Sequence, residues 1–261
     1  MGVTGVKAYT AFGSAGARHV FLLYSDQDGR LLAILEADWL GRIRTGATTG
    51  LATRLLARAD ATRLAVIGAG VQAWSQIEAI CSVRPIEAVD VYSPSAERRT
   101  ALARRIRADL GIAASAVASA HRAVVEADIV TTVTTAKDPV PHGGWLASGT
   151  HVNAVGSNWQ DRREIDDEVV TRSALIVVDA LDQAKREAGD LIQPVARGIL
   201  NWERVSELGD HIVGRFPQRS TEDITLFKSV GIAIEDVAVA KCVYALALEH
   251  GLGESLTLAG S

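Results

Sequence analysis

Short apolar runs alternate with stretches of helical periodicity through the middle of the chain. Strands that are buried on both faces read as continuous apolar runs, and their alternation with helices is typical of a parallel sheet covered on both sides. The pattern therefore predicts an α/β fold, a Rossmann-type doubly wound parallel sheet. The expected strands are 64–67, 89–92, 128–133, 151–155 and 174–178, and the clearest helices are 71–83 and 95–109.

The N-terminal pattern is different, because three strand-like runs are separated by turn signals. These runs are 6–12, 20–24 and 31–36, with turns at 13–16 and 26–29. Such spacing predicts antiparallel strands. Helical spacing follows over 37–58, and most of the chain after Asp179 is also helical, with 224–250 forming one or two helices broken near Gly231.

These patterns predict a main domain and a smaller one. We expect the N-terminal part of a smaller α+β domain over 1–58, and a Rossmann-type domain over 59–215. The C-terminal helices over 216–261 are expected to return to the smaller domain.

A glycine-rich turn, Gly68-Ala69-Gly70-Val71-Gln72-Ala73, joins the first strand of the main domain to its helix. Gly68 permits a tight turn, Gly70 lets a phosphate approach the backbone, and Ala73 allows close packing of helix on strand. The N–H groups at the start of the helix suit a pyrophosphate. We expect a dinucleotide here; the alternative is an ordinary tight strand-to-helix turn.

The end of the second strand bears on the choice of cofactor. An acidic residue at this position binds the ribose 2′-hydroxyl of NAD and repels the 2′-phosphate of NADP. Here the chain has Ser93 instead, followed by Ser95, Arg98 and Arg99. These residues favour NADP(H) over NAD(H); the alternative is that both arginines are solvated residues of the helix.

Composition and charge exclude several classes of function. The 261 residues are 48% hydrophobic and carry a net charge of −4, so we expect neither a nucleic-acid partner nor a membrane. The six histidines lack metal-ligand spacing, and we expect no metal. Cys81 and Cys242 lie in apolar helical patterns, which predicts buried, reduced thiols in a cytoplasmic protein.

Several motifs in a fixed order carry a resemblance to a known family. They are Gly5-Val6-Lys7, Arg42-Ile43-Arg44-Thr45-Gly46-Ala47, the turn at 68–73, His151-Val152-Asn153-Ala154-Val155-Gly156, Arg163-Glu164-Ile165-Asp166, Glu187-Ala188-Gly189-Asp190 and Leu226-Phe227-Lys228-Ser229-Val230-Gly231. Over nearly its whole length the chain resembles the ornithine cyclodeaminase and mu-crystallin family, which includes alanine dehydrogenases and ketimine reductases.

The resemblance implies roles for particular residues. Lys7 and Arg44 would hold the α-carboxylate of the substrate, Arg44 would also touch the cofactor, and Val230 would lie beside the substrate. Two cations on different elements can fix a carboxylate in this way. Together with Gly68, Gly70, Ser93 and Arg98, the residues expected around the cofactor are Val71, Gln72, Thr134, Val155, Gly156, Ser157, Arg162 and Ser229.

Asn158 stands where cyclodeaminases have a proton-transferring aspartate. An amide cannot act as a general base, although it can orient a water or an amine. The resemblance therefore implies an NAD(P)(H)-dependent oxidoreductase of a small amino acid or a cyclic or acyclic imino acid. The alternatives are a cyclodeaminase-type lyase with catalytic NAD and a non-catalytic NADP(H)-dependent binding protein of the mu-crystallin type.

The family also bears on the N-terminal region and on assembly. Its members usually carry further strands and a helix before the segment that matches Gly5, including another substrate-binding arginine. We expect either a true start upstream or an incomplete substrate pocket and dimer sheet. The exposed N-terminal strands suggest a homodimer.

Overall fold

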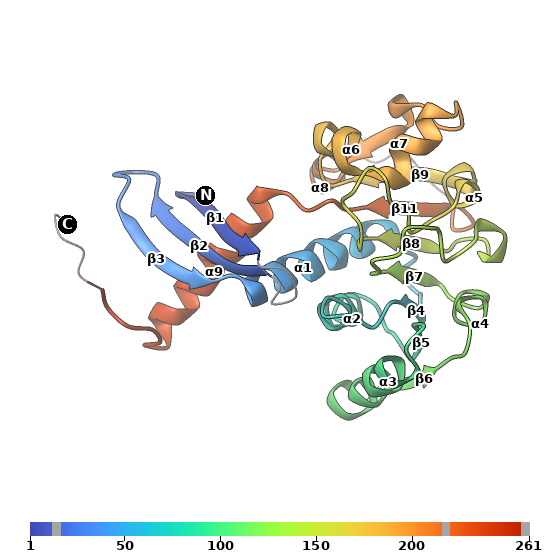
Figure 1. The fold of residues 1–261 in the computed structure, drawn as a ribbon, viewed down its shortest axis with the longest axis horizontal. Helices are drawn as coiled ribbons and strands as arrows, with labels where there is room; N and C mark the ends of the chain where they lie inside the picture. Colours follow the sequence, from blue (N-terminus) through green and yellow to red (C-terminus); the bar gives the residue numbers. More distant parts are fainter. Residues whose placement is uncertain (12–16, 216–219, 257–261) are drawn as a thin grey trace. The chain divides into compact units, whose positions relative to one another are not determined.

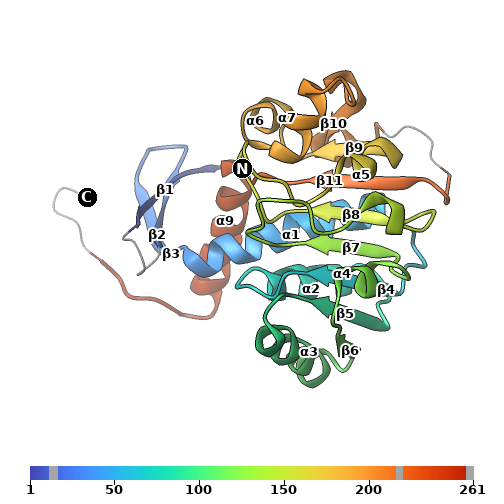
Figure 2. The ribbon, with the colours of Figure 1, turned by 45° about the vertical axis from the view of Figure 1, so that its right-hand side comes forward.

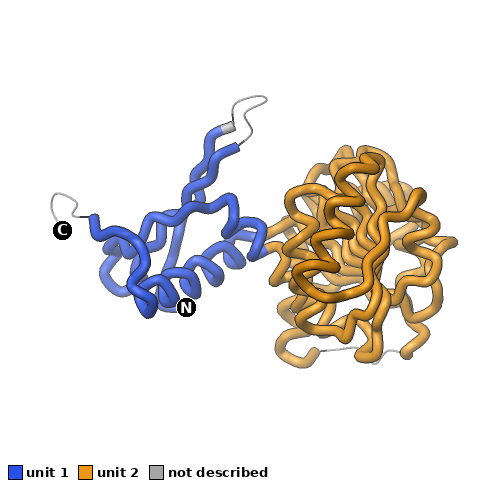
Figure 3. Tube along the Cα trace, turned by 90° about the horizontal axis from the view of Figure 1, so that it is seen from below, with its two compact units in different colours: residues 1–44, 232–261 blue, residues 45–231 orange. Residues whose placement is uncertain are grey.

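The computed structural model of the chain describes residues 1–11, 17–215 and 220–256. The predicted turn at 13–16 and the last residue of the first predicted strand therefore lie outside the described residues. Residues 1–44 with 232–261 form one compact unit, and residues 45–231 form a second (Figure 3). These limits differ from the predicted domain limits at 58/59 and 215/216, because residues 45–58 and 220–231 belong to the second unit.

A parallel sheet forms the centre of the second unit. Its order in the described residues is β10-β9-β11-β8-β7-β4-β5-β6, and every neighbouring pair is parallel (Figure 2). This topology confirms the predicted Rossmann-type fold. The strands are β4 (Arg63–Ile67), β5 (Ala88–Tyr92), β6 (Ala113–Ala116), β7 (Ile129–Thr132), β8 (His151–Ala154), β9 (Ser173–Val178), β10 (Val205–Glu207) and β11 (Ile224–Lys228).

Helices cover both faces of this sheet, as Figure 1 shows for α2 and α3 on one face and α4 and α5 on the other. Strand β4 alternates between two cores: Leu64 and Val66 pack with α2 and α3, whereas Ala65 and Ile67 pack with α4 and α5. The helices are α1 (Asp38–Leu56), α2 (Ala73–Cys81), α3 (Ala96–Leu110), α4 (Ala120–Val124), α5 (Asp167–Arg172), α6 (Leu181–Glu187), α7 (Gly189–Ala196) and α8 (Leu208–Ile212), with 3₁₀ turns at Gly143–Trp145 and Trp202–Arg204.

Strand β11 corrects the prediction of a helix from residue 224. Residues Ile224–Lys228 are fully buried and lie between β8 and β9 in the sheet. Leu226 packs into the core on one face, and Phe227 packs into the core on the other. The five residues Ile-Thr-Leu-Phe-Lys are too few for a period that distinguishes a buried strand from a buried helix, so only the sheet partners decide.

The first unit contains an antiparallel sheet in the order β1-β2-β3, together with helix α9. Its elements are β1 (Val3–Ala11), β2 (Ala17–Ser25), β3 (Leu31–Glu36) and α9 (Ala233–Glu249). Phe21 and Leu23 of β2 are buried with Leu40 and with Ala240 of α9. N-terminal strands and the C-terminal helix thus share one core, which confirms the predicted smaller α+β domain.

Within the described residues, no helix combines the length and the apolar character that crossing a bilayer requires.

Candidate functional site

The glycine-rich turn lies where β4 passes into α2. Gly68 has φ +116°, and a Cβ atom added to it would overlap the carbonyl oxygen of Val133, which follows β7. Its N–H donates to the carbonyl of Tyr92 at 2.8 Å. A Cβ atom at Gly70 would meet no described atom within 4 Å. Gly68 is thus required by the fold itself, whereas Gly70 leaves open space beside the backbone.

The first turn of α2 has no side-chain cap and carries one buried acceptor without a partner among the described atoms. In the described structure, the N-cap residue Gln72 makes no side-chain capping bond. Its Oε1 atom is buried without a hydrogen-bond partner among the described atoms. Because no side chain caps the helix, its first N–H groups can bind an anion. The turn therefore fits the pyrophosphate of a dinucleotide.

A cavity of about 450 Å³ opens beside this turn. Strand β4 lies between β5 and β7, so the chain reverses its strand order here, and α/β sheets bind ligands at such a point. The cavity is lined by Ile67, Gly68, Ala69, Gly70, Tyr92, Ser93, Pro94, Ser95, Arg98, Val133, Thr134, Thr135, Ala136 and Val140. The structure thus brings together five of the predicted cofactor residues: Gly68, Gly70, Ser93, Arg98 and Thr134.

The residues that were predicted to favour NADP(H) over NAD(H) have different hydrogen-bond partners. Ser95 caps α3, since its Oγ atom accepts from the Arg98 N–H at 3.2 Å. Arg99 donates to the carbonyl oxygen of Ser93 at 2.8 Å, whereas Arg98 lines the cavity. Arg98 is therefore the better placed of the two arginines to receive a phosphate in this cavity.

Asp179, at the end of β9, organises the turn after β11, and sequence reasoning missed it. Its Oδ2 atom accepts from the Ser229 hydroxyl at 2.9 Å, from the Val230 N–H at 2.8 Å and from the Gly231 N–H at 2.6 Å. Ser229 and Val230 are both buried. One carboxylate thus fixes two residues that were predicted to contact cofactor and substrate.

A second group that sequence reasoning missed consists of Glu164, Asp190 and Lys228, each 0% exposed. Lys228 lies 2.9 Å from Asp190, and Glu164 accepts from the Thr134 and Gly156 N–H groups at 2.7 and 2.6 Å. Burial raises the pKa of Glu164. All three residues lie in motifs that carry the family resemblance, but nothing in those motifs indicated that the three side chains meet.

The remaining predicted residues of the second unit lie in loops at the carboxyl ends of strands. Val155, Gly156 and Ser157 follow β8, and Ser157 is buried. Asn158 is exposed, as is Val71, which is 69% exposed. The Arg162 guanidinium lies 5.3 Å from the ring centroid of Trp159. None of Val71, Gln72, Val155, Gly156, Ser157, Arg162 and Ser229 lines the cavity beside Gly68.

Lys7 and Arg44 both belong to the first unit, where acidic residues of α9 accompany them. Lys7 Nζ lies 2.8 Å from Asp236 Oδ2, and Arg44 Nε lies 3.4 Å from Asp236 Oδ1. Arg44 also contacts Glu235 at 2.9 Å. The two adjacent carboxylates are thus both salt-bridge partners of Arg44.

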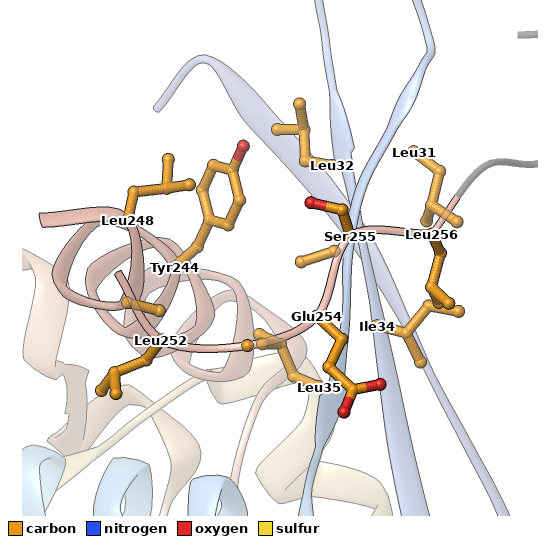
Figure 4. A pocket seen from close by; sticks show the side chains of 13 residues that line it. Leu31, Leu32, Ile34, Leu35, Tyr244, Leu248, Leu252, Glu254, Ser255 and Leu256 are labelled. Carbon is orange, nitrogen blue, oxygen red and sulfur yellow. The ribbon is translucent and has the colours of Figure 1, made fainter. Parts of the chain in front are cut away.

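An apolar groove of about 410 Å³ lies within the first unit (Figure 4). Leucine and isoleucine side chains of β3 line one part, and Tyr244 and Leu248 of α9 line another. The segment from Leu252 to Leu256 completes it. Its lining has one charged residue, Glu254, so the groove lacks the cations that a carboxylate or phosphate requires.

The cysteines differ in environment. Cys81 is half-buried, and burial raises the pKa of its thiol to about 11. Cys242 is exposed, which corrects the prediction that both are buried. Across the described ranges, no group of three His, Cys, Asp or Glu side chains could hold a metal ion.

Comparison with known proteins places this arrangement in a family. The model of the ornithine cyclodeaminase/mu-crystallin family matches residues 3–251. A Δ1-pyrroline-2-carboxylate reductase of Bacillus cereus is 40% identical over 256 residues, which are 97% of this chain and 78% of that protein. An alanine dehydrogenase of Archaeoglobus fulgidus is 36% identical over 91% of this chain and 73% of its own.

A solved structure is similar as well. The Δ1-pyrroline-2-carboxylate reductase of Thermococcus litoralis, in complex with NADH and L-proline, has a TM-score of 0.92 and 38% identity, covering 97% of this chain and 80% of that one. The chain belongs to the ornithine cyclodeaminase/mu-crystallin family, as its sequence motifs predicted.

Proposed function

We propose that the chain is a nicotinamide-dependent oxidoreductase that reduces a small imino acid or oxidises the corresponding amino acid. The observation that carries the proposal is the cavity beside Gly68, where an uncapped helix start and open space at Gly70 suit a dinucleotide. Family relatives at 36–40% identity include an imino acid reductase and an amino acid dehydrogenase. Both fit a cofactor that exchanges hydride with the α-carbon.

The cofactor would be held by residues of the second unit. Gly68, Gly70 and Gln72 would bind the pyrophosphate, and Thr134, Val155, Gly156, Ser157, Arg162 and Ser229 would surround the remainder together with Val71. When bound, the dihydronicotinamide supplies the hydride. Asp179 would keep Ser229 in place through their 2.9 Å hydrogen bond.

The substrate carboxylate would be bound by Lys7 and Arg44, and Val230 would lie beside the substrate. A carboxylate that binds here joins a group in which two cations already face Glu235 and Asp236. The paired acids hold both cations in defined positions before the substrate arrives, which reduces the entropy lost on binding. Asn158 would orient the substrate nitrogen or a water, since an amide both donates and accepts.

We propose NADP(H) as the preferred cofactor. Ser93 introduces no carboxylate that would repel a 2′-phosphate, and Arg98 lines the same cavity. Arg99 supports the site indirectly through the Ser93 carbonyl.

The substrate we propose is a five-membered cyclic imine that carries a carboxylate, with Δ1-pyrroline-2-carboxylate as the representative. Two relatives near 40% identity carry this activity in their names. Asn158 argues against cyclodeamination, because an amide cannot accept the proton that ring closure releases.

Absorbance of the reduced nicotinamide provides the test. Purified protein is mixed with NADPH or NADH and, separately, with Δ1-pyrroline-2-carboxylate, its six-membered homologue, or pyruvate with ammonia. We expect stoichiometric cofactor oxidation, fastest with the five-membered imine and NADPH. Ammonia release from ornithine without net cofactor turnover would instead establish a cyclodeaminase, and cofactor binding without turnover of any substrate would establish a binding protein.

We further propose that the protein assembles as a homodimer through the first unit. Val6, Val20 and Ile34 lie on one face of its sheet and expose 40–55% of their surface, which is typical of a face that pairs with another chain. Light scattering coupled to size exclusion should give twice the mass of the 27.7 kDa chain; a monomer would refute the assembly.

A further inference from the structure

Three charged side chains are buried together at the carboxyl ends of β7, β8 and β11. Glu164, Asp190 and Lys228 are each 0% exposed. Burying charged side chains costs free energy unless each of them has a partner. Where such charges are fully partnered, their hydrogen bonds hold the surrounding backbone in one geometry. The partners of these charges show which geometry is fixed.

Glu164 joins two loops through backbone hydrogen bonds. Its Oε1 atom accepts from Thr134 N–H at 2.7 Å, and its Oε2 atom accepts from Gly156 N–H at 2.6 Å. In a trans peptide the carbonyl points opposite to the N–H, so Glu164 also sets the direction of the Val133 and Val155 carbonyls. A Cβ at Gly156 would overlap both Thr134 N and Glu164 Oε1, so glycine is required for this close approach.

Lys228 and Asp190 also make hydrogen bonds to the backbone near Gly156 and Glu164. Lys228 Nζ donates to the Ser157 carbonyl at 2.5 Å and lies 2.9 Å from Asp190 Oδ2. Asp190 Oδ1 accepts from the N–H groups of Glu164 and Ile165 at 2.7 and 3.1 Å. Asp190 therefore fixes the backbone that carries Glu164, and Lys228 links Asp190 to the loop at Ser157.

We propose that Glu164, held by Lys228 and Asp190, is a positioning residue for the nicotinamide half of the cofactor, acting through the peptide planes at Thr134 and Gly156. The inference rests on the proposed function and adds the group that orients the loops after β7 and β8. The adenine half would depend instead on Gly68, Gly70, Ser93 and Arg98, which line the cavity beside Gly68 and make none of the hydrogen bonds of Glu164.

The variant Glu164→Gln tests this division in the full chain. Its amide keeps the size of the carboxylate but offers an acceptor to one N–H only, while its NH2 faces the other N–H. Dissociation constants are measured for NADPH and NADH by fluorescence and for ADP-ribose, which lacks the nicotinamide, by calorimetry. We expect the dissociation constants for NADPH and NADH to rise about ten-fold or more in the variant. The dissociation constant for ADP-ribose should change by about two-fold at most.

Glu168→Gln is the matched control, because Glu168 is exposed on the neighbouring helix α5, and it should bind every ligand as the wild type does. Should Glu164→Gln fail to fold, Glu164→Asp keeps the charge but is too short to reach both N–H groups, and the same division is expected. Unchanged NADPH affinity, or an equal loss for ADP-ribose, overturns the positioning role. Wild-type protein that binds neither NADH nor NADPH overturns the proposed function, and this inference with it.

Discussion

The Oδ2 atom of Asp236 lies 2.8 Å from the Nζ atom of Lys7, although the two residues are 229 positions apart in the chain. The other oxygen of the same carboxylate lies 3.4 Å from Arg44 Nε. One side chain at the start of α9 thus joins β1 and α1, the two elements that carry the proposed carboxylate-binding cations.

The substitution Asp236→Asn is expected to destabilise the protein. Asp236 is only 5% exposed, so removing its charge takes the carboxylate partner from Lys7 and one of the two acidic partners from Arg44. We expect the free energy of unfolding to fall by about 2 kcal/mol, measured by chemical denaturation. The exposed Glu249→Gln on the same helix is the control, and an equal stability of both variants would refute the role.

The substitution Lys7→Gln should weaken substrate binding and spare the cofactor. If the ammonium binds the carboxylate of the imino acid, its loss raises KM for that substrate by about ten-fold or more. The dissociation constant for NADPH should stay as in the wild type. Lys241→Gln, which removes only a surface bond to the Met1 carbonyl, is the comparison. An unchanged KM would exclude Lys7 from the site.

Replacing either glycine of the turn by alanine should have a different effect: one substitution should lower stability, and the other should weaken cofactor binding. Gly68→Ala forces a Cβ against the Val133 carbonyl at a positive φ and should lower the free energy of unfolding by about 1–3 kcal/mol. Gly70→Ala meets no described neighbour, so stability should change by less than about 0.5 kcal/mol.

Gly70→Ala should nevertheless weaken NADPH binding by about ten-fold, because the methyl group takes the space of a phosphate. Denaturation and fluorescence titration measure the two effects separately. Gly209→Ala on α8, where a Cβ also meets no described atom, should change neither. Wild-type affinity of Gly70→Ala would remove the turn from the cofactor site.

Cofactor preference should depend on Arg98. The substitution Arg98→Ala is expected to raise KM for NADPH by about ten-fold and to leave KM for NADH unchanged, since only NADPH carries the 2′-phosphate. Arg104→Ala, an exposed arginine of the same helix, controls for the general loss of positive charge. Equal effects on both cofactors would contradict the proposed NADP(H) preference.

Stability should decrease in mild acid through His211. Burial lowers the pKa of this imidazole, whose Nε2 lies 2.7 Å from the Ser206 hydroxyl. In the unfolded chain the imidazole binds its proton near pH 6.5. The stability that the neutral imidazole contributes is therefore fully present above that pH, and it is lost as the pH falls toward the lower native pKa.

The free energy of unfolding is measured by chemical denaturation from pH 7.5 to 5.5. Its slope against pH should be smaller in His211→Gln than in the wild type, by up to about 1.4 kcal/mol per pH unit. The difference between the two proteins isolates His211 from other titrating groups. Identical slopes would show that His211 does not carry the effect.

The accuracy of the sequence predictions followed the range of the interactions involved. The strand, glycine turn and helix around 63–81 are contiguous, and their local pattern was enough to predict the order of elements that the structure has. The same reasoning placed 224–228 in a helix, because a short apolar run carries no information about the strands it will join. The partners of β11 are β8 and β9, and the nearer of them in sequence, β9, ends at Val178.

The range of the interactions also separates the site residues that were predicted from those that were missed. Motif and strand order were enough to predict that Gly68, Gly70, Ser93, Arg98 and Thr134 serve one ligand, and these residues line one cavity. Neither motif nor strand order revealed how the carboxylates hold the loops, because Asp179 and Glu164 accept mainly from backbone N–H groups that lie 8 to 52 positions away in the chain. Backbone partners leave no signature in residue type.

By itself the sequence determined the family, the Rossmann-type sheet and the position of the glycine-rich turn, since each depends on local patterns and motifs that can be read segment by segment. Only the tertiary structure decided that β11 enters the middle of the sheet, that Asp236 contacts both Lys7 and Arg44, and that Glu164, Asp190 and Lys228 are buried together. The physical reason is that a buried charge is tolerated only beside its partners, and folding, not sequence proximity, brings those partners together.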